Sequence, residues 1–141
     1  MAITARSLAN LQVEISTPNH QIIADEPIHA GGDDMGPNPY DLLLSSLAAC
    51  KIITVQMYAR RKNWPLTGVE LQMSTNKIHA RDCEDCESDP NAKVDIIETE
   101  IKFLGDLDGD QLERLRDISE KCPVHRTLSS ETKVRTRLLS E

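Results

Sequence analysis

A long apolar segment, residues 42–59, most constrains how this chain can fold. Asn38 is a good helix N-cap and Pro39 suits the first helical position, so we predict a helix over residues 39–62, roughly 36 Å long. Apolar or small residues cover nearly every direction around its axis, which is typical of a helix buried on most sides. A chain of 141 residues has trouble covering such a helix alone. The pattern therefore favours burial against a partner subunit.

Polar side chains inside this helix argue against a membrane span. They are Ser45, Ser46, Lys51, Thr54 and Gln56. The first sixteen residues also lack the basic-then-apolar pattern of a signal peptide. We therefore expect a cytoplasmic protein with no membrane partner.

Charge and aromatic content argue against a nucleic-acid-binding surface. The chain has 16 Lys and Arg against 23 Asp and Glu, a net charge of −7, and aromatic residues make up only 3% of it. A basic footprint and aromatic stacking platforms are the usual signs of nucleic-acid binding. We expect no nucleic-acid partner and a core that is mainly aliphatic.

Alternating apolar and polar residues predict strands on both sides of the long helix. We expect an N-terminal hairpin over residues 8–25, strands over 68–104, a second and amphipathic helix over 110–121, and a last strand over 133–138. No internal repeat or low-complexity tract is present, so residues 1–141 are expected to form a single domain.

Two cysteines lie in apolar, structured settings. Cys50 is in the middle of the long helix, where a free cysteine is usually a small core residue. Cys122 ends the second predicted helix and precedes Pro123, a favoured first residue of another helix; a thiol there faces unpaired N–H groups that stabilise a thiolate. His125 could tune that thiol or simply face solvent. From the residues alone, core and reactive interpretations of both cysteines stay open.

Cys83 and Cys86 form a lone C-x-x-C motif in an acidic loop. With His79 they supply three possible zinc ligands, and His125 or a distant residue could be the fourth. A structural zinc site normally shows a second paired motif, so we favour a hairpin-loop dithiol slightly over a metal site. No phosphate loop or dinucleotide fingerprint is present, and no cofactor is expected.

Two motifs resemble one known family. Residues 36–43 (GPNPYDLL) followed by residues 47–50 (LAAC) resemble the G-x-N/S-P-x-x-L…A-C signature of the OsmC/Ohr proteins, the osmotically inducible and organic hydroperoxide resistance proteins. Residues 121–124 (KCPV) are similar to the family's second motif, a C-P dipeptide further along the chain. The order of predicted elements also agrees along nearly the whole chain, whereas the C-x-x-C loop is an addition.

The resemblance implies an α+β fold in which antiparallel sheets wrap around long central helices in an intertwined homodimer. It also implies thiol-dependent reduction of organic hydroperoxides. One cysteine attacks the peroxide and becomes a sulfenic acid, the second condenses with it into a disulfide, and a dithiol reductant such as a lipoyl protein restores both thiols. By position, Cys50 is the peroxidatic residue and Cys122 the resolving residue.

The sequence departs from the family pattern in the group that activates the thiolate. Ohr-type members use an arginine oriented by a glutamate ten residues before the first cysteine; Tyr40 occupies that position here, and no arginine occurs between Arg6 and Arg60. We expect Lys51 to extend to solvent, while Ser46 could bond to the thiolate or merely pack. The alternatives are a redox-sensing or ligand-binding member without turnover and a zinc-binding protein that uses the C-x-x-C loop.

Overall fold

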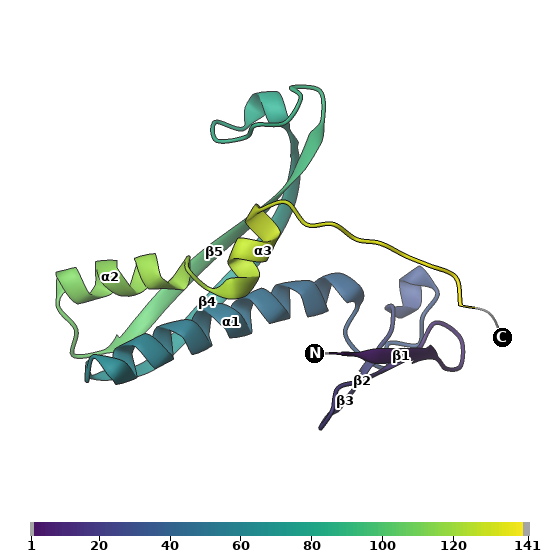
Figure 1. The fold of residues 1–141 in the computed structure, drawn as a ribbon, viewed down its shortest axis with the longest axis horizontal. Helices are drawn as coiled ribbons and strands as arrows, with labels where there is room; N and C mark the ends of the chain where they lie inside the picture. Colours follow the sequence, from purple (N-terminus) through teal and green to yellow (C-terminus); the bar gives the residue numbers. More distant parts are fainter. Residues whose placement is uncertain (1, 140–141) are drawn as a thin grey trace. The chain divides into compact units, whose positions relative to one another are not determined.

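The computed structural model describes residues 2–139, which divide after Ser46 into two compact units (Figure 1). The boundary falls within one helix, α1 (Pro39–Arg61), which ends one residue before the predicted end. The expectation of a single domain over residues 1–141 stays a prediction. The two units are described separately.

The first unit contains a three-stranded antiparallel sheet in the order β1 (Thr4–Ser7), β2 (Val13–Ser16), β3 (Gln21–Ala24). The predicted hairpin over residues 8–25 corresponds to β2 and β3, in which Ile15 lies opposite Ile22. The strand β1 was not predicted because its sequence, TARS, shows no apolar alternation; in the structure all four residues are exposed.

The loop between β3 and α1 is organised around the buried carboxylate of Asp25. Its oxygens accept hydrogen bonds from the backbone N–H groups of Glu26, Asp33 and Met35 at 2.8, 3.2 and 3.0 Å. The helix then begins as predicted, because the Asn38 side chain accepts the N–H of Asp41 at 2.8 Å and so caps α1.

The second unit is built on a long antiparallel hairpin, β4 (Leu66–His79) and β5 (Lys93–Gly105), in which Leu71 lies opposite Ile101. A short 3-10 turn (Ala80–Asp82) opens the loop that joins the two strands. Figure 1 shows α1, α2 (Gly109–Ser119) and α3 (Pro123–Ser129) on one side of this hairpin. The helix α2 begins with a complete Asp108–Gln111 capping box.

The core of this unit joins α1 and α2 to the hairpin. Its buried members are Val55, Tyr58, Ala59, Leu115 and Ile118. Trp64 packs edge to face on Tyr58 with ring centroids 5.5 Å apart, so the core is not purely aliphatic.

The face of α1 opposite this core remains exposed. Ile53 is 53% exposed and Met57 65% exposed. By length and composition α1 could cross a membrane, although only 28% of its most apolar window is buried within the chain. The predicted burial of α1 on most sides is therefore not achieved within this single chain.

The expected last strand over residues 133–138 does not form. Residues 131–139 have no regular secondary structure, and Val134 and Leu138 are almost fully exposed. The alternation of side chains identifies which residues could share a face, but a strand also needs a neighbour to take its N–H and C=O groups. No such neighbour pairs with these residues in the described part of the chain.

Candidate functional site

The structure brings together two cysteines that are far apart in sequence. Cys50 is half-buried on α1, and Cys122 is fully buried at the N-cap of α3. The N–H of Val124 donates to Cys50 Sγ at 3.5 Å, and the N–H of His125 donates to Cys122 Sγ at 3.3 Å. Both sulfurs therefore lie at the first turn of the same helix.

Local sequence explains why these donors are free. Pro123 stands in the first turn of α3 and has no N–H. The next two N–H groups have no carbonyl partner inside the helix, as at every helix start. They point at the two sulfurs instead, an arrangement that favours negative charge on sulfur.

The Cys122 thiol is held neutral by its surroundings. Burial is the largest cause that raises its pKa, and the side-chain interaction with Cys50 raises the pKa further. The His125 N–H and the charge of Lys51 lower the pKa, in part offsetting the burial. A neutral thiol is a weak nucleophile, so Cys122 is less suited to attack a substrate first than to react with an already oxidised Cys50.

The prediction that Lys51 extends to solvent is wrong. Its side chain is buried, and Nζ donates to the Ser119 carbonyl at 3.1 Å and lies 2.9 Å from His125 Nδ1. Long lysines usually keep their charge in water, but here the end of α2 and the start of α3 offer two acceptors inside the fold. The missed signal was spacing, because Lys51 lies midway between Leu47 and Val55 on the buried stripe of α1.

His125 belongs to the same cluster. Because an ammonium group only donates, Nδ1 must accept from Lys51, which requires a neutral imidazole. Burial is the main cause that lowers the His125 pKa, the charge of Lys51 lowers it further, and Glu120 opposes them. The sequence left open whether His125 faces solvent or tunes a thiol. In the structure His125 is half-buried and contacts the Lys51 ammonium group.

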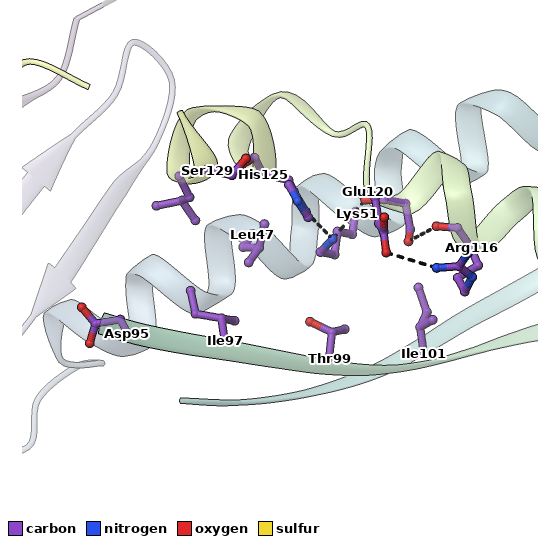
Figure 2. Close-up of a pocket in the computed structure, with 12 residues that line it drawn as sticks. Leu47, Lys51, Asp95, Ile97, Thr99, Ile101, Arg116, Glu120, His125 and Ser129 are labelled. Atoms are coloured by element: carbon purple, nitrogen blue, oxygen red, sulfur yellow. Dashed lines mark hydrogen bonds and ion pairs between the residues drawn. The ribbon is translucent and has the colours of Figure 1, made fainter. Parts of the chain in front are cut away.

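A cavity of about 410 Å³ lies beside the cysteine pair, between α1, β5 and the segment from α2 to α3 (Figure 2). Both apolar and polar side chains line it. The lining comprises Leu47, Lys51, Asp95, Ile97, Thr99, Ile101, Arg116, Ser119, Glu120, His125, Leu128 and Ser129. Neither sulfur lines the cavity, but Lys51, which follows Cys50, and His125, whose N–H donates to Cys122 Sγ, both line it.

Comparison with known proteins decides the family. Residues 31–137 match the family model described as OsmC-like protein. This chain belongs to the OsmC family. Its α+β fold with antiparallel sheets agrees with OsmC-like structures, as the resemblance implied.

Solved structures similar to this OsmC family member share its fold at low sequence identity. A Psychrobacter arcticus protein provisionally described as an osmotic stress induced and detoxification response protein is 19% identical, with 89% and 86% of the two chains covered and a TM-score of 0.70. An OsmC-like protein from Mycoplasma pneumoniae is 24% identical over 90% and 85%, with a TM-score of 0.65. The organic hydroperoxide resistance protein OsmC of Legionella pneumophila is 18% identical over 91% and 88%, with a TM-score of 0.62. No curated protein matches the chain by sequence.

Ser46 and Tyr40, the two further residues related to thiolate activation, make no contact with a cysteine sulfur among the described hydrogen bonds of this OsmC family member. The Ser46 hydroxyl donates to the Leu43 carbonyl at 2.6 Å, a bond within its own helix. Tyr40, at the position of the Ohr-type glutamate, is 61% exposed.

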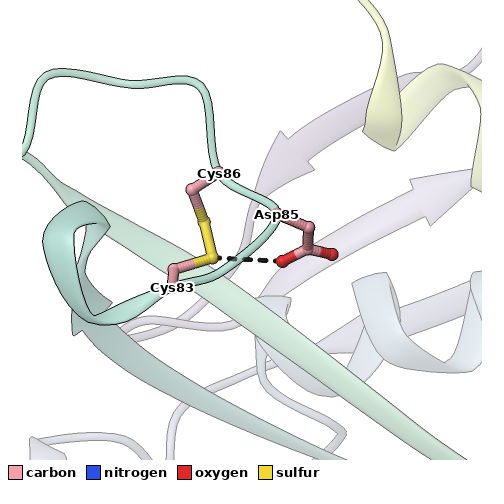
Figure 3. The surroundings of a disulfide bond; sticks show 3 residues. All are labelled: Cys83, Asp85 and Cys86. Carbon is pink, nitrogen blue, oxygen red and sulfur yellow. Dashed lines mark hydrogen bonds between the residues drawn. A yellow bond between two sulfur atoms is a disulfide. The ribbon is translucent and has the colours of Figure 1, made fainter.

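The C-x-x-C loop contains a disulfide between Cys83 and Cys86, whose Cα atoms are 5.5 Å apart (Figure 3). Asp85 Oδ1 lies 3.2 Å from Cys83 Sγ, and one ligand atom from each of these three residues lies within 4.8 Å of the others. His79 is not part of this group, and its buried Nδ1 has no partner among the described residues. The group of possible metal ligands therefore contains Asp85 in place of His79. Zinc binding by the loop with its cysteines reduced stays a prediction.

Proposed function

We propose that this OsmC family member reduces organic hydroperoxides and that Cys50 and Cys122 are its redox pair. The observation that carries the proposal is the meeting of both free thiols at the first turn of α3. The Legionella relative is named an organic hydroperoxide resistance protein, which supports the substrate class.

The two thiols differ in access, which assigns their order. Cys50 is half-buried and can meet a substrate, whereas Cys122 is fully buried. Cys50 attacks the peroxide and becomes a sulfenic acid, and the alcohol leaves. The Cys122 sulfur then attacks the Cys50 sulfur, so that a disulfide forms and water leaves. An external dithiol, such as a lipoyl protein, reduces this disulfide.

The neighbouring cavity suits an apolar substrate. Ile97, Ile101 and Leu128 give apolar walls to the cavity, which Lys51, the residue after Cys50, also lines. Binding of an apolar chain against these walls would remove apolar surface from contact with water, which favours binding. The peroxide group would then face the α1 and α3 side, where the thiols lie.

The active form is a cytoplasmic homodimer in this proposal. Ile53 and Met57 leave an apolar face of α1 open to solvent. Monomeric soluble proteins seldom expose such helix faces, and a second copy would cover it by symmetry. Sedimentation velocity of the purified protein measures the mass directly, and a monomer would contradict this part.

The test is one equivalent of cumene hydroperoxide followed by peptide mapping with mass spectrometry. After this treatment we expect a disulfide between Cys50 and Cys122 in the unsubstituted protein and a trapped sulfenic acid on Cys50 in Cys122→Ser. The variant with serine at positions 83 and 86 is the matched control and should form the same disulfide. An unreacted Cys50 would overturn the assignment.

The second candidate is a redox sensor that shares the thiol pair but does not turn over. Tyr40 favours it, because this exposed residue replaces the glutamate that orients the activating arginine in Ohr-type members. Steady-state consumption of hydroperoxide with dihydrolipoamide separates the two. An enzyme consumes peroxide continuously, and a sensor stops after one equivalent.

A further inference from the structure

Lys51 is the only buried cationic side chain among the described residues, with 5% of its surface exposed. Burial of an ammonium group is costly unless its hydrogen bonds and charge are compensated. None of the ion pairs within the described residues includes Lys51. Its two partners, a carbonyl and a neutral imidazole, leave the positive charge without a carboxylate.

The partners of Lys51 stand on both sides of Cys122 in the chain. Ser119, whose carbonyl accepts one hydrogen bond, ends α2, and His125, whose Nδ1 accepts another, lies in the first turn of α3. Two bonds from one ammonium group thus tie the segment that contains Cys122 to α1. On α1, the residue before Lys51 is Cys50.

None of the other charged side chains that line the cavity forms an ion pair with the Lys51 ammonium group among the described residues. Arg116 and Glu120 pair with each other at 3.2 Å, and Asp95 lies on β5. The ammonium group uses two of its three donors and has one left. His125, whose Nδ1 accepts from Lys51, donates its backbone N–H to Cys122 Sγ at 3.3 Å, and the charge of Lys51 lowers the pKa of Cys122.

We propose that Lys51 is the positioning cation of the disulfide-forming step: it holds the Cys122 segment against α1 and stabilises the negative charge on the Cys122 sulfur as this sulfur attacks oxidised Cys50. The inference rests on the proposed function. In the step, the S–S bond forms and the S–O bond of Cys50 sulfenic acid breaks. The thiol proton of Cys122 leaves with the hydroxide as water, so Cys122 is oxidised and the sulfenic sulfur is reduced.

The first test follows a single turnover by quenching and mass spectrometry, with sulfenic acid trapped by dimedone. Lys51→Gln keeps a hydrogen-bond donor without the charge, and Lys51→Arg keeps the charge. We expect Lys51→Gln to close the disulfide about tenfold more slowly at pH 7 and to accumulate Cys50 sulfenic acid, because loss of a nearby opposite charge raises a pKa by about one unit. Lys51→Arg should restore most of the rate.

The matched control is Lys121→Met. Lys121 precedes Cys122 directly but is exposed, so its removal changes net charge by the same amount without altering the buried site. We expect closure at the normal rate. Normal closure in Lys51→Gln, or equal slowing in Lys51→Arg and Lys51→Gln, would overturn the proposal.

The second test does not depend on peroxidase activity. In a chain with serine at positions 50, 83 and 86, Cys122 is the single thiol, and its ionisation is followed by thiolate absorbance near 240 nm against the same chain with Cys122→Ser. Lys51→Gln should move the midpoint up by about one unit, and Lys51→Arg should not. An unchanged midpoint in folded Lys51→Gln would refute the role of the charge, whereas a shifted midpoint without hydroperoxide turnover would refute only the proposed function.

Discussion

The two pairs of cysteines in this protein have contrasting surroundings. Cys50 and Cys122 are remote in sequence, remain free thiols and meet where α1 packs on α3. Cys83 and Cys86 are three residues apart and form a disulfide in the loop between β4 and β5. The first pair depends on the tertiary structure, whereas the second depends only on its local chain.

The difference shows how neighbours determine the chemistry of a sulfur atom. The distant pair receives two backbone N–H groups; burial raises the pKa of Cys122, and the His125 N–H and the charge of Lys51 offset part of that rise. The loop pair has a carboxylate oxygen of Asp85 at 3.2 Å instead. The proposed hydroperoxide chemistry therefore concerns the distant pair alone.

The largest expected effect separates the two pairs by activity. Cys50→Ser should lower hydroperoxide turnover by at least about 10³-fold, because it removes the nucleophile. Replacing Cys83 and Cys86 together with serine should leave turnover close to its original value. Turnover is measured by loss of cumene hydroperoxide with dihydrolipoamide as reductant. Equal losses in the two variants would break the distinction.

Stability should separate the two regions as well. Leu115 is fully buried in the core that supports α1 and α2, so Leu115→Ala should lower the free energy of unfolding by about 2–5 kcal/mol. Glu84 lies exposed in the C-x-x-C loop, and Glu84→Ala should change this free energy by less than about 0.5 kcal/mol. Urea denaturation followed by circular dichroism measures both.

A smaller effect concerns pH near the distant pair. Because the His125 pKa in the fold is below its ordinary value of 6.5, folding favours the neutral imidazole. The resulting stabilisation is complete above pH 6.5 and is lost as the pH falls through the lower folded value. His125→Gln, which keeps an acceptor for Lys51, should therefore lose less thermal stability between pH 7 and pH 5 than the original protein. An equal fall in melting temperature between pH 7 and pH 5 in the two proteins would contradict this role of His125.

The smallest expected effect is metal content. With its disulfide formed, the loop offers no thiolate ligands, so elemental analysis of protein purified without chelator should find no stoichiometric zinc. One zinc per chain that disappears when Cys83 and Cys86 are replaced with serine would instead establish the zinc-binding alternative.

Much of the fold could be predicted from local patterns. Asn38 and Pro39 fixed the start of α1, and Asp108 with Gln111 fixed the start of α2, because caps act over a few residues. The pattern failed for residues 133–138, where alternation was present but no strand partner exists among the described residues.

The sequence by itself determined which residues could react, since the cysteines and their two motifs are visible in it and identify the family. Only the tertiary structure decided what surrounds them. Lys51 looked like a surface lysine because its two acceptors, Ser119 and His125, lie more than sixty positions away in the chain. Side-chain chemistry is encoded residue by residue, but the burial and partners that tune a charge arise only when distant segments pack together.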